Sequence, residues 1–360
     1  MTSICDEPVF VVGHVKSGTT LVQSLLDGHP DLFVLPLELK FLQHANVPTL
    51  PPGNRARGGL PSHRVPWKAA DLPPGRVLEE VLGNADPADF LAGRPVSRNL
   101  PLEAWSFDRE LFRRRVERAD RSSLRSVFVD LAEAFHEAHR AGGDPSDPAS
   151  GGEGPAAGTP PPTPRLVEKT PQQEEHAREL ARWFPEARFV HVLRNPYAVV
   201  NAEARDKSVH RSRRHRVYRP LAKSLYFLER NRRHLDRYRV VRFEDVVLET
   251  ESTMRELAEF LELPFRPSML RPTIGGRPWG GNSRTVDGEF EGVDPRPVHA
   301  FRDQIAPLDV AVVNRYFGPM LERHGYERLP DPGWRKWLPV GIEPPNLYVG
   351  NRVLLYTSYL

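Results

Sequence analysis

The sequence has little cysteine, no long apolar run and almost no net charge. Its single cysteine, Cys5, excludes an intramolecular disulfide and a metal site built from cysteines. No apolar stretch approaches the length of a membrane span, and the first residues lack the basic and apolar regions of a signal peptide. We therefore expect a cytoplasmic protein without a membrane partner.

The balance of charges gives little reason to expect a nucleic-acid partner. The chain carries 50 basic and 47 acidic residues, and 39% of its residues are hydrophobic, as in a globular protein. One segment, residues 205–219, is strongly basic but contains few aromatic residues. It is either a solvated arm or a region that attracts an anionic cofactor, and the sequence favours neither interpretation.

A strand, a loop bounded by glycines and a helix are expected near the start of the chain. Val9–Val12 is a short apolar run typical of a buried strand, and a helical pattern begins near Leu21. Such a unit directs backbone N–H groups and a helix N-terminus toward an anion. The predicted anion-binding residues are Lys16, Ser17, Gly18, Thr19 and Thr20. The alternative is a glycine-containing turn that binds nothing.

This loop is close to a Walker A sequence but differs from it at the lysine. The spacing Gly13-x4-Gly18 is right, yet Thr19 stands where the lysine of that motif belongs. The cation lies upstream at Lys16, an arrangement that suits a phosphate or sulfate better than a nucleoside triphosphate with magnesium. A P-loop kinase is therefore a less favoured alternative.

The rest of the chain predicts an α/β fold with a central, mainly parallel sheet flanked by helices. A strand edge and turn are expected at 165–171, and strands at 188–193 and 239–245. Arg194 lies at the end of the strand 188–193, where ligands of open α/β sheets bind. A capping box, Thr253 to Glu256, predicts one helix start, and a last helix is expected over 307–324.

The predicted organisation is one domain over residues 1–330, with two long insertions and a tail. Residues 46–75 are rich in proline, glycine and arginine and are expected to form a loop over a cleft or a disordered insertion. Residues 142–164 are of low complexity and predict a flexible loop. No role can be assigned to residues 331–360.

Several ordered segments together resemble the sulfotransferases that use 3′-phosphoadenosine 5′-phosphosulfate (PAPS), especially bacterial members and the carbohydrate-modifying branch. Residues 16–20 are similar to the family's 5′-phosphosulfate loop, and residues 188–196 to the strand and turn that bind the 3′-phosphate. Residues 238–264 resemble the strand and capped helix that follow. Residues 281–284 and 290–293 resemble the C-terminal cofactor loop. The resemblance implies a three-layer fold of the P-loop type.

The resemblance also implies three catalytic residues. Lys16 would stabilise the leaving phosphate. Glu38, in a segment similar to the carbohydrate branch's E-x-H-F-F, would be the general base, with Lys40 in place of the histidine and with its pKa raised by burial. Lys169 would neutralise the sulfonate or orient the acceptor. The alternatives are an ordinary surface carboxylate for Glu38, and a salt bridge with Glu168 or another acid for Lys169.

Donor binding, by the same resemblance, would involve residues from three segments of the chain. They are Lys16, Ser17, Gly18, Thr19, Thr20, Arg194, Asn201, Asn282, Ser283 and Arg284. One departure stands out, because Ala202 occupies the position where the family usually has a serine that contacts the 3′-phosphate. One hydrogen bond to the 3′-phosphate is therefore missing unless Asn201 or the basic segment replaces it. The alternative is a catalytically impaired nucleotide-binding module of the same fold.

The function expected from the sequence is in-line transfer of a sulfuryl group from PAPS, leaving adenosine 3′,5′-bisphosphate. The acceptor would be a hydroxyl of a small molecule or carbohydrate, and an amine is the less favoured alternative. No metal is expected, because lysines and backbone dipoles supply the positive charge. The identity of the acceptor and the oligomeric state are not encoded in any readable pattern.

Overall fold

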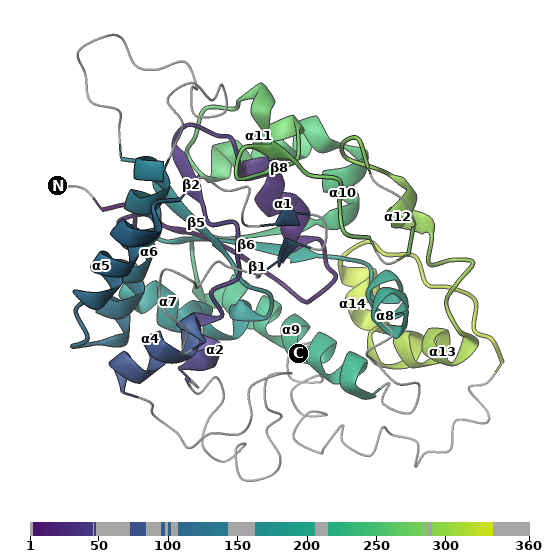
Figure 1. Cartoon of the computed structure of the whole chain (residues 1–360). Coiled ribbons are helices and arrows are strands. Elements are labelled where there is room, and N and C mark those ends of the chain that lie inside the picture. Colours follow the sequence, from purple (N-terminus) through teal and green to yellow (C-terminus); the bar gives the residue numbers. More distant parts are fainter. Residues whose placement is uncertain are drawn as a thin grey trace.

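A central sheet of five parallel strands organises the chain (Figure 1). The computed structural model describes residues 3–45, 47, 73–83, 95–97, 100–101, 107–142, 163–205, 215–283, 285–286 and 290–333. The strand order is β2-β5-β1-β6-β7. The strands are β1 (Val9–Val12), β2 (Leu32–Val34), β5 (Arg165–Lys169), β6 (Arg188–Leu193) and β7 (Tyr238–Arg242). The α/β fold predicted from the sequence is confirmed.

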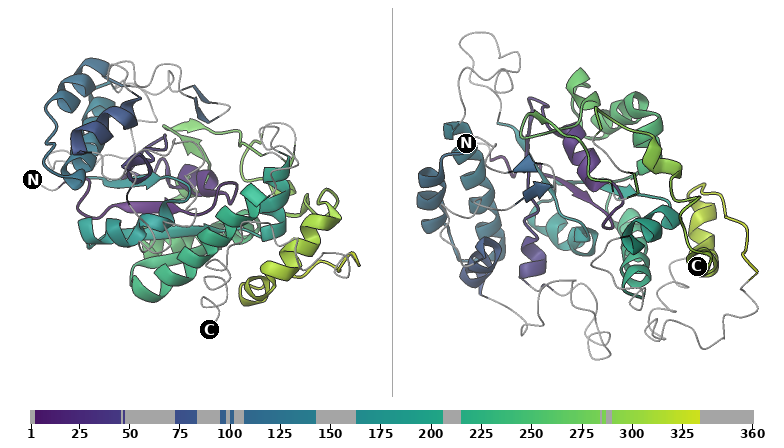
Figure 2. Two further views of the ribbon diagram at one scale, coloured as in Figure 1. Left: turned by 90° about the horizontal axis from the view of Figure 1, so that it is seen from below. Right: turned by 45° about the vertical axis from the view of Figure 1, so that its right-hand side comes forward.

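Helices cover both faces of the sheet, as the views in Figures 1 and 2 show. One face carries α2 (Phe41–His44), α4 (Pro74–Leu82), α5 (Arg109–Glu117), α6 (Leu124–Gly142) and α7 (Ala177–Trp183). The other carries α1 (Thr19–Leu26), α10 (Phe243–Leu248), α11 (Thr250–Phe260) and the 3-10 helix η5 (Pro267–Leu270). A third cluster joins α8 (Pro196–Ala204), α9 (His215–His234), α13 (Pro307–Tyr316) and α14 (Gly318–Arg323).

Strand β1 shows why the sheet must be covered on both sides. Phe10 and Val12 pack into the core beneath α6 and α7, whereas Val9 and Val11 pack into the core beneath α1 and α11. All four side chains are fully buried. A continuous apolar run of this kind is typical of a central parallel strand, because both of its faces lie away from water.

The remaining elements are short. They are the 3-10 helix η3 (Gln173–His176), helix α12 (Arg296–His299), and two small hairpins, β3 (Pro95–Ser97) with β4 (Leu100–Pro101) and β8 (Thr273–Ile274) with β9 (Arg277–Pro278). None of the helices in the described ranges is both long and apolar enough to cross a membrane.

Several predicted boundaries are wrong. Helix α4 begins at Pro74, inside the loop expected over 46–75, because proline is favoured in the first helical turn. Helix α6 extends to Gly142, the residue at which the second loop was expected to begin. Residues 48–72 and 143–162 lie outside the described residues. His215, in the basic segment, already belongs to α9. Residues 206–214 and 334–360 also lie outside the described ranges.

Two predictions about helices and one about a strand end also need correction. The capping box at Thr253 is wrong, because α11 already begins at Thr250. The strand expected to reach residue 245 ends at Arg242, and α10 follows at once. The last helix is two helices, since the backbone leaves helical geometry at Phe317.

Candidate active site

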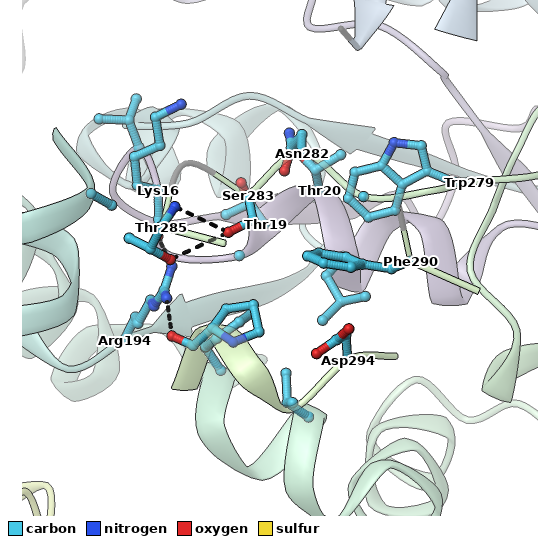
Figure 3. A pocket seen from close by; sticks show the side chains of 18 of the residues that line it. Lys16, Thr19, Thr20, Arg194, Trp279, Asn282, Ser283, Thr285, Phe290 and Asp294 are labelled. Carbon is cyan, nitrogen blue, oxygen red and sulfur yellow. Dashed lines mark hydrogen bonds between the residues drawn. The ribbon is translucent and has the colours of Figure 1, made fainter. Parts of the chain in front are cut away.

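A cleft opens beside the anion loop, residues 13–20, which connects β1 to α1 (Figure 3). Six segments of the chain line it. The lining residues are Val15, Lys16, Gly18, Thr19, Thr20, Leu21, Glu38, Pro171, Arg194, Ala202, Phe243, Val247, Trp279, Gly281, Asn282, Ser283, Thr285, Phe290, Gly292, Asp294 and Pro297. The strand order β2-β5-β1-β6 explains the convergence, because the loops after parallel strands meet at one edge of the sheet.

The N-terminus of α1 faces this cleft without a side-chain cap. Gly18 is the N-cap residue, with φ of 99°, and as a glycine it has no side chain to cap the first-turn N–H groups. Thr19 and Thr20, the first two helical residues, both line the cleft. Uncapped first-turn N–H groups and the positive end of a helix dipole favour an anion.

Gly18 is required by its surroundings as well as by its backbone angle. A Cβ atom at this position would clash with the ring of Phe243. Phe243 lines the cleft and also supports Arg194, whose guanidinium carbon lies 4.3 Å from the ring centroid. The close approach of Gly18 to Phe243 therefore fixes the loop against α10.

Ser17 turns away from the cleft, in contrast to its neighbours. Its backbone N–H donates to the carbonyl of His14 at 3.1 Å, which closes a turn inside the loop. Its side chain is buried, and within the described part of the chain its Oγ has no hydrogen-bond partner. Ser17 is not among the residues that line the cleft.

Arg194 lies at the end of β6 and joins two walls of the cleft. Its Nη1 donates to the carbonyl of Lys16 and its Nη2 to the carbonyl of Pro297, both at 2.9 Å. Its Nε is buried and has no partner among the described residues. Burial lowers the pKa of Arg194 to about 10, so the guanidinium remains positive at neutral pH.

Ala202, and not Asn201, faces the cleft. The amide of Asn201 donates to Gln304 Oε1 at 3.0 Å, and Gln304 in turn donates to the carbonyl of Thr285 at 3.1 Å. Through Gln304, Asn201 therefore supports the segment that carries Thr285. Asn201 itself does not line the cleft, whereas Ala202 and Thr285 do. This placement gives no support to the expectation that Asn201 replaces the family's serine.

The C-terminal segment forms the opposite wall of the cleft. Asn282 and Ser283, two of the residues proposed from the sequence to bind the donor, line it, and Arg284 lies outside the described residues. Trp279 and Phe290 add two aromatic side chains, labelled in Figure 3. Sequence reasoning missed Trp279, although an aromatic residue beside two glycines in a loop was a usable signal.

Glu38 is held between two lysines. Its Oε1 lies 2.8 Å from Lys169 Nζ, and its Oε2 lies 3.0 Å from Lys40 Nζ. Burial would raise the pKa of Glu38, but the two positive charges outweigh it and lower the pKa to about 2. The expectation of a raised pKa is therefore wrong, because the sequence did not show that both lysines reach this carboxylate.

Lys169 connects Glu38 to the anion loop. It is almost completely buried, and its Nζ also donates to Thr20 Oγ1 at 3.3 Å. Lys169 therefore forms a salt bridge with Glu38 and not with its neighbour Glu168. The carboxylate of Glu168 instead accepts from Thr170 at 2.6 Å and from Gln173 at 2.7 Å. Burial raises the pKa of Glu168 to about 7.

Unusual backbone angles gather in the loops around the cleft. Lys16, Lys40 and Gln172 have φ values of 65°, 51° and 66°, although none of them is glycine. They follow β1, β2 and β5, three neighbouring strands. Strained residues of this kind persist where the surrounding structure fixes them, and they are concentrated at functional sites.

Comparisons with known proteins agree with this fold. The sequence profile of the Sulfotransferase family matches residues 8–80 and 96–267. A sulfotransferase domain from the Synechococcus PCC 7002 olefin synthase is 19% identical, with a TM-score of 0.51, over 91% of this chain and 98% of that one. A sulfotransferase domain from the curacin biosynthetic pathway is 17% identical, with a TM-score of 0.52, over 90% and 99%. A search of curated proteins gave no match.

Proposed function

The chain belongs to the sulfotransferase family, and we propose that it transfers a sulfuryl group from PAPS to a hydroxyl of a small-molecule or carbohydrate acceptor. The observation that carries this proposal is the meeting of the uncapped α1 N-terminus, Lys16 and Arg194 in one cleft. Two cations and a helix N-terminus suit a donor that carries a phosphosulfate and a separate phosphate.

The residues present fit this donor. With Gly18 at the N-cap, the N-terminus of α1 has no side-chain cap, and its first residues, Thr19 and Thr20, line the cleft where an anion would bind. The buried Nε of Arg194, with no partner in the described ranges, is a donor that a phosphate oxygen would satisfy. Trp279 and Phe290 supply flat aromatic surfaces suited to a purine base.

The proposed roles of the catalytic residues follow from where charge develops. As the acceptor oxygen bonds to sulfur, the bond from sulfur to the bridging phosphate oxygen breaks, and the acceptor's proton passes to Glu38. Lys16 stabilises the charge that appears on the leaving phosphate, and Lys169 the charge on the sulfonate. Thr19 and Thr20 contribute the first-turn N–H groups of α1, and Asn282 and Ser283 contribute polar groups on the opposite wall.

One observation favours a second candidate function. Ala202 brings a methyl group to the wall where the family usually has a serine, and Asn201 is bonded to Gln304 instead. A catalytically impaired nucleotide-binding module would bind adenosine 3′,5′-bisphosphate without transferring a sulfuryl group. Binding and turnover must therefore be measured separately.

The test is calorimetric titration of the whole chain with adenosine 3′,5′-bisphosphate. We expect micromolar-range binding by the wild type, roughly −8 kcal/mol at 1 M standard state. Arg194→Ala should abolish it, but this residue also holds the Lys16 and Pro297 carbonyls, so Arg194→Lys serves as the charge-conserving control. A folded wild type that does not bind contradicts the proposal.

Turnover with PAPS then separates the two candidates. A panel of phenol, alcohol, sugar and amine acceptors should show sulfation by at least one hydroxyl compound. Glu38→Gln should lower this turnover about 100-fold or more while leaving binding of the bisphosphate intact. Binding without turnover of any acceptor supports the impaired module.

A further inference from the structure

Asp27 occupies a position that local electrostatics disfavours. It is the C-cap residue of α1, where the negative end of the helix dipole repels a carboxylate. It is also buried, at 7% exposure. Burial raises its pKa, and hydrogen bonds from Gly276 and Thr273 offset part of that effect. A carboxylate that is both buried and placed at a helix C-terminus is expected to have a compensating role.

The partners of Asp27 lie about 250 residues further along the chain. Its Oδ2 accepts from Thr273 Oγ1 at 2.7 Å and from the backbone N–H of Gly276 at 2.8 Å. Thr273 belongs to β8, and Gly276 lies in the two-residue turn between β8 and β9. Gly275 and Gly276 both have positive φ, 59° and 75°, as a tight hairpin turn of this type requires.

The hairpin leads directly into the cleft. Trp279 follows β9, and its N–H donates to the carbonyl of Pro272 at 3.0 Å, which continues the pairing of the two strands. Asn282 and Ser283 come next, and all three residues line the cleft. The position of the hairpin therefore sets the position of this wall.

The same helix carries the opposite wall at its other end. Thr19 and Thr20 begin α1 at the anion loop, and Asp27 follows its last residue. Eight residues of helix span about 12 Å, so a single short and rigid element separates the two walls. Helix α1 also packs against β8 and η5, which brings the hairpin to its side.

We propose that Asp27 is a positioning residue for the donor: its bonds to Thr273 and Gly276 hold the wall formed by residues 279–283 at a fixed distance from the anion loop. This inference rests on the proposed function, because the donor is the molecule that bridges both walls. Asp27 does not touch the cleft, since it is not among the lining residues.

The test compares Asp27→Ala with Asp27→Asn in the whole chain. In Asp27→Ala the hydroxyl of Thr273 and the N–H of Gly276 lose their acceptor, and the wall is free to shift. We expect the dissociation constant for adenosine 3′,5′-bisphosphate and the KM for PAPS to rise about tenfold or more, since small displacements in a binding site have large effects. The kcat at saturating PAPS should change much less. Asn at position 27 keeps an acceptor oxygen and should restore most of the affinity.

Two further variants keep the result interpretable. Asp309→Ala removes an equally buried acid that accepts from Tyr218 and does not line the cleft, so it reproduces the loss of stability without the loss of affinity. Thr273→Val removes one of the two donors and should raise the dissociation constant a few-fold, which tests the inference even where Asp27→Ala does not fold.

The outcomes separate the inference from the proposed function. Wild-type affinity in folded Asp27→Ala, or an equal loss of affinity in Asp309→Ala, overturns the positioning role alone. Absence of bisphosphate binding by the wild type overturns the proposed function and the inference together. Weak binding by Asp27→Ala with recovery in Asp27→Asn supports both.

Discussion

At the scale of single residues, the two lysines around Glu38 decide what this carboxylate can do. Because Lys169 and Lys40 lower its pKa to about 2, Glu38 is ionised at neutral pH but binds a proton weakly. Lys169 also contacts Thr20 at the N-terminus of α1. An anion bound at that terminus competes with Glu38 for Lys169. A weaker ion pair between Glu38 and Lys169 raises the proton affinity of Glu38. Donor binding and base strength are thereby linked in the mechanism we propose.

The first prediction concerns this proposed base. Glu38→Gln is nearly isosteric but cannot take a proton, so we expect kcat to fall about 100-fold or more. The dissociation constant of adenosine 3′,5′-bisphosphate should change less than threefold (roughly 0.6 kcal/mol). Initial rates and calorimetry measure the two effects. An unchanged kcat would show that another group accepts the proton.

Another carboxylate, Glu174, is buried and holds the start of the anion loop. Its Oε2 accepts from the N–H of Gly13 at 3.1 Å, and its Oε1 accepts from the hydroxyl of Ser224. The N–H of Gln172 donates to the carbonyl of Gly13 at 2.8 Å, so both backbone groups of Gly13 are fixed. Burial raises the pKa of Glu174 to about 7.

The second prediction follows from that raised pKa. The pKa of a glutamate in an unfolded chain is about 4.3. Between that pH and about 7, Glu174 therefore keeps a proton in the folded state that it has lost in the unfolded state. The contribution of Glu174 to the free energy of unfolding is therefore full below that window and is lost as the pH rises through it. Glu174→Gln should remove this part of the pH dependence, on the order of 1–3 kcal/mol.

Urea unfolding at several pH values between 5 and 8 measures this effect, as the difference between wild type and variant. Other groups titrate in the same range, including Glu168, but they are common to both proteins and cancel. A difference that does not change with pH would contradict the raised pKa of Glu174.

At the scale of elements, the third prediction concerns the turn that connects the anion loop to α1. Gly18 and Gly325 both have positive φ, 99° and 70°. A Cβ at Gly18 would clash with Phe243, whereas a Cβ at Gly325 would meet nothing within 4 Å. Gly325→Ala should therefore lower the free energy of unfolding only because alanine disfavours a left-handed backbone, by about 1–2 kcal/mol. Gly18→Ala should lower the free energy of unfolding by about 1–3 kcal/mol more than Gly325→Ala does, because the added methyl group overpacks against Phe243. It should also abolish bisphosphate binding.

Chemical unfolding and calorimetry of the two glycine variants test this difference. Equal costs for Gly18→Ala and Gly325→Ala would show that the Phe243 ring moves aside without penalty. Retained bisphosphate affinity in Gly18→Ala would remove the anion loop from the proposed donor site.

At the scale of the whole molecule, the fourth prediction concerns the coupling of ligand to folding. The donor cleft is built from segments of the chain between residues 15 and 297, so a ligand that fills it binds only the folded state. Adenosine 3′,5′-bisphosphate at 100 times its dissociation constant should stabilise the protein by about 2.7 kcal/mol. Thermal unfolding with and without the ligand measures this shift, and Arg194→Ala should show none. A wild type whose Tm is unaffected contradicts the proposed site.

The sequence by itself determined most of the local structure. The apolar run Val9–Val12, the glycine-bounded loop and the apolar run before Arg194 each predicted an element or a turn that the structure contains. These signals are local, because burial pattern, glycine angles and proline placement act within a few residues. Helix ends were less certain, as Thr253 shows, because a capping motif inside a helix has the same letters as one at its start.

Only the tertiary structure decided the electrostatics and the walls of the site. The low pKa of Glu38 depends on Lys169, which lies 131 residues away and is brought near because β5 lies between β2 and β1. The contact of Asp27 with the β8–β9 hairpin, and the exposure of Ala202 rather than Asn201 to the cleft, have the same origin. Strand order and loop packing bring these groups together, and no local pattern of residues specifies either, because the free energy of such contacts depends on the whole fold.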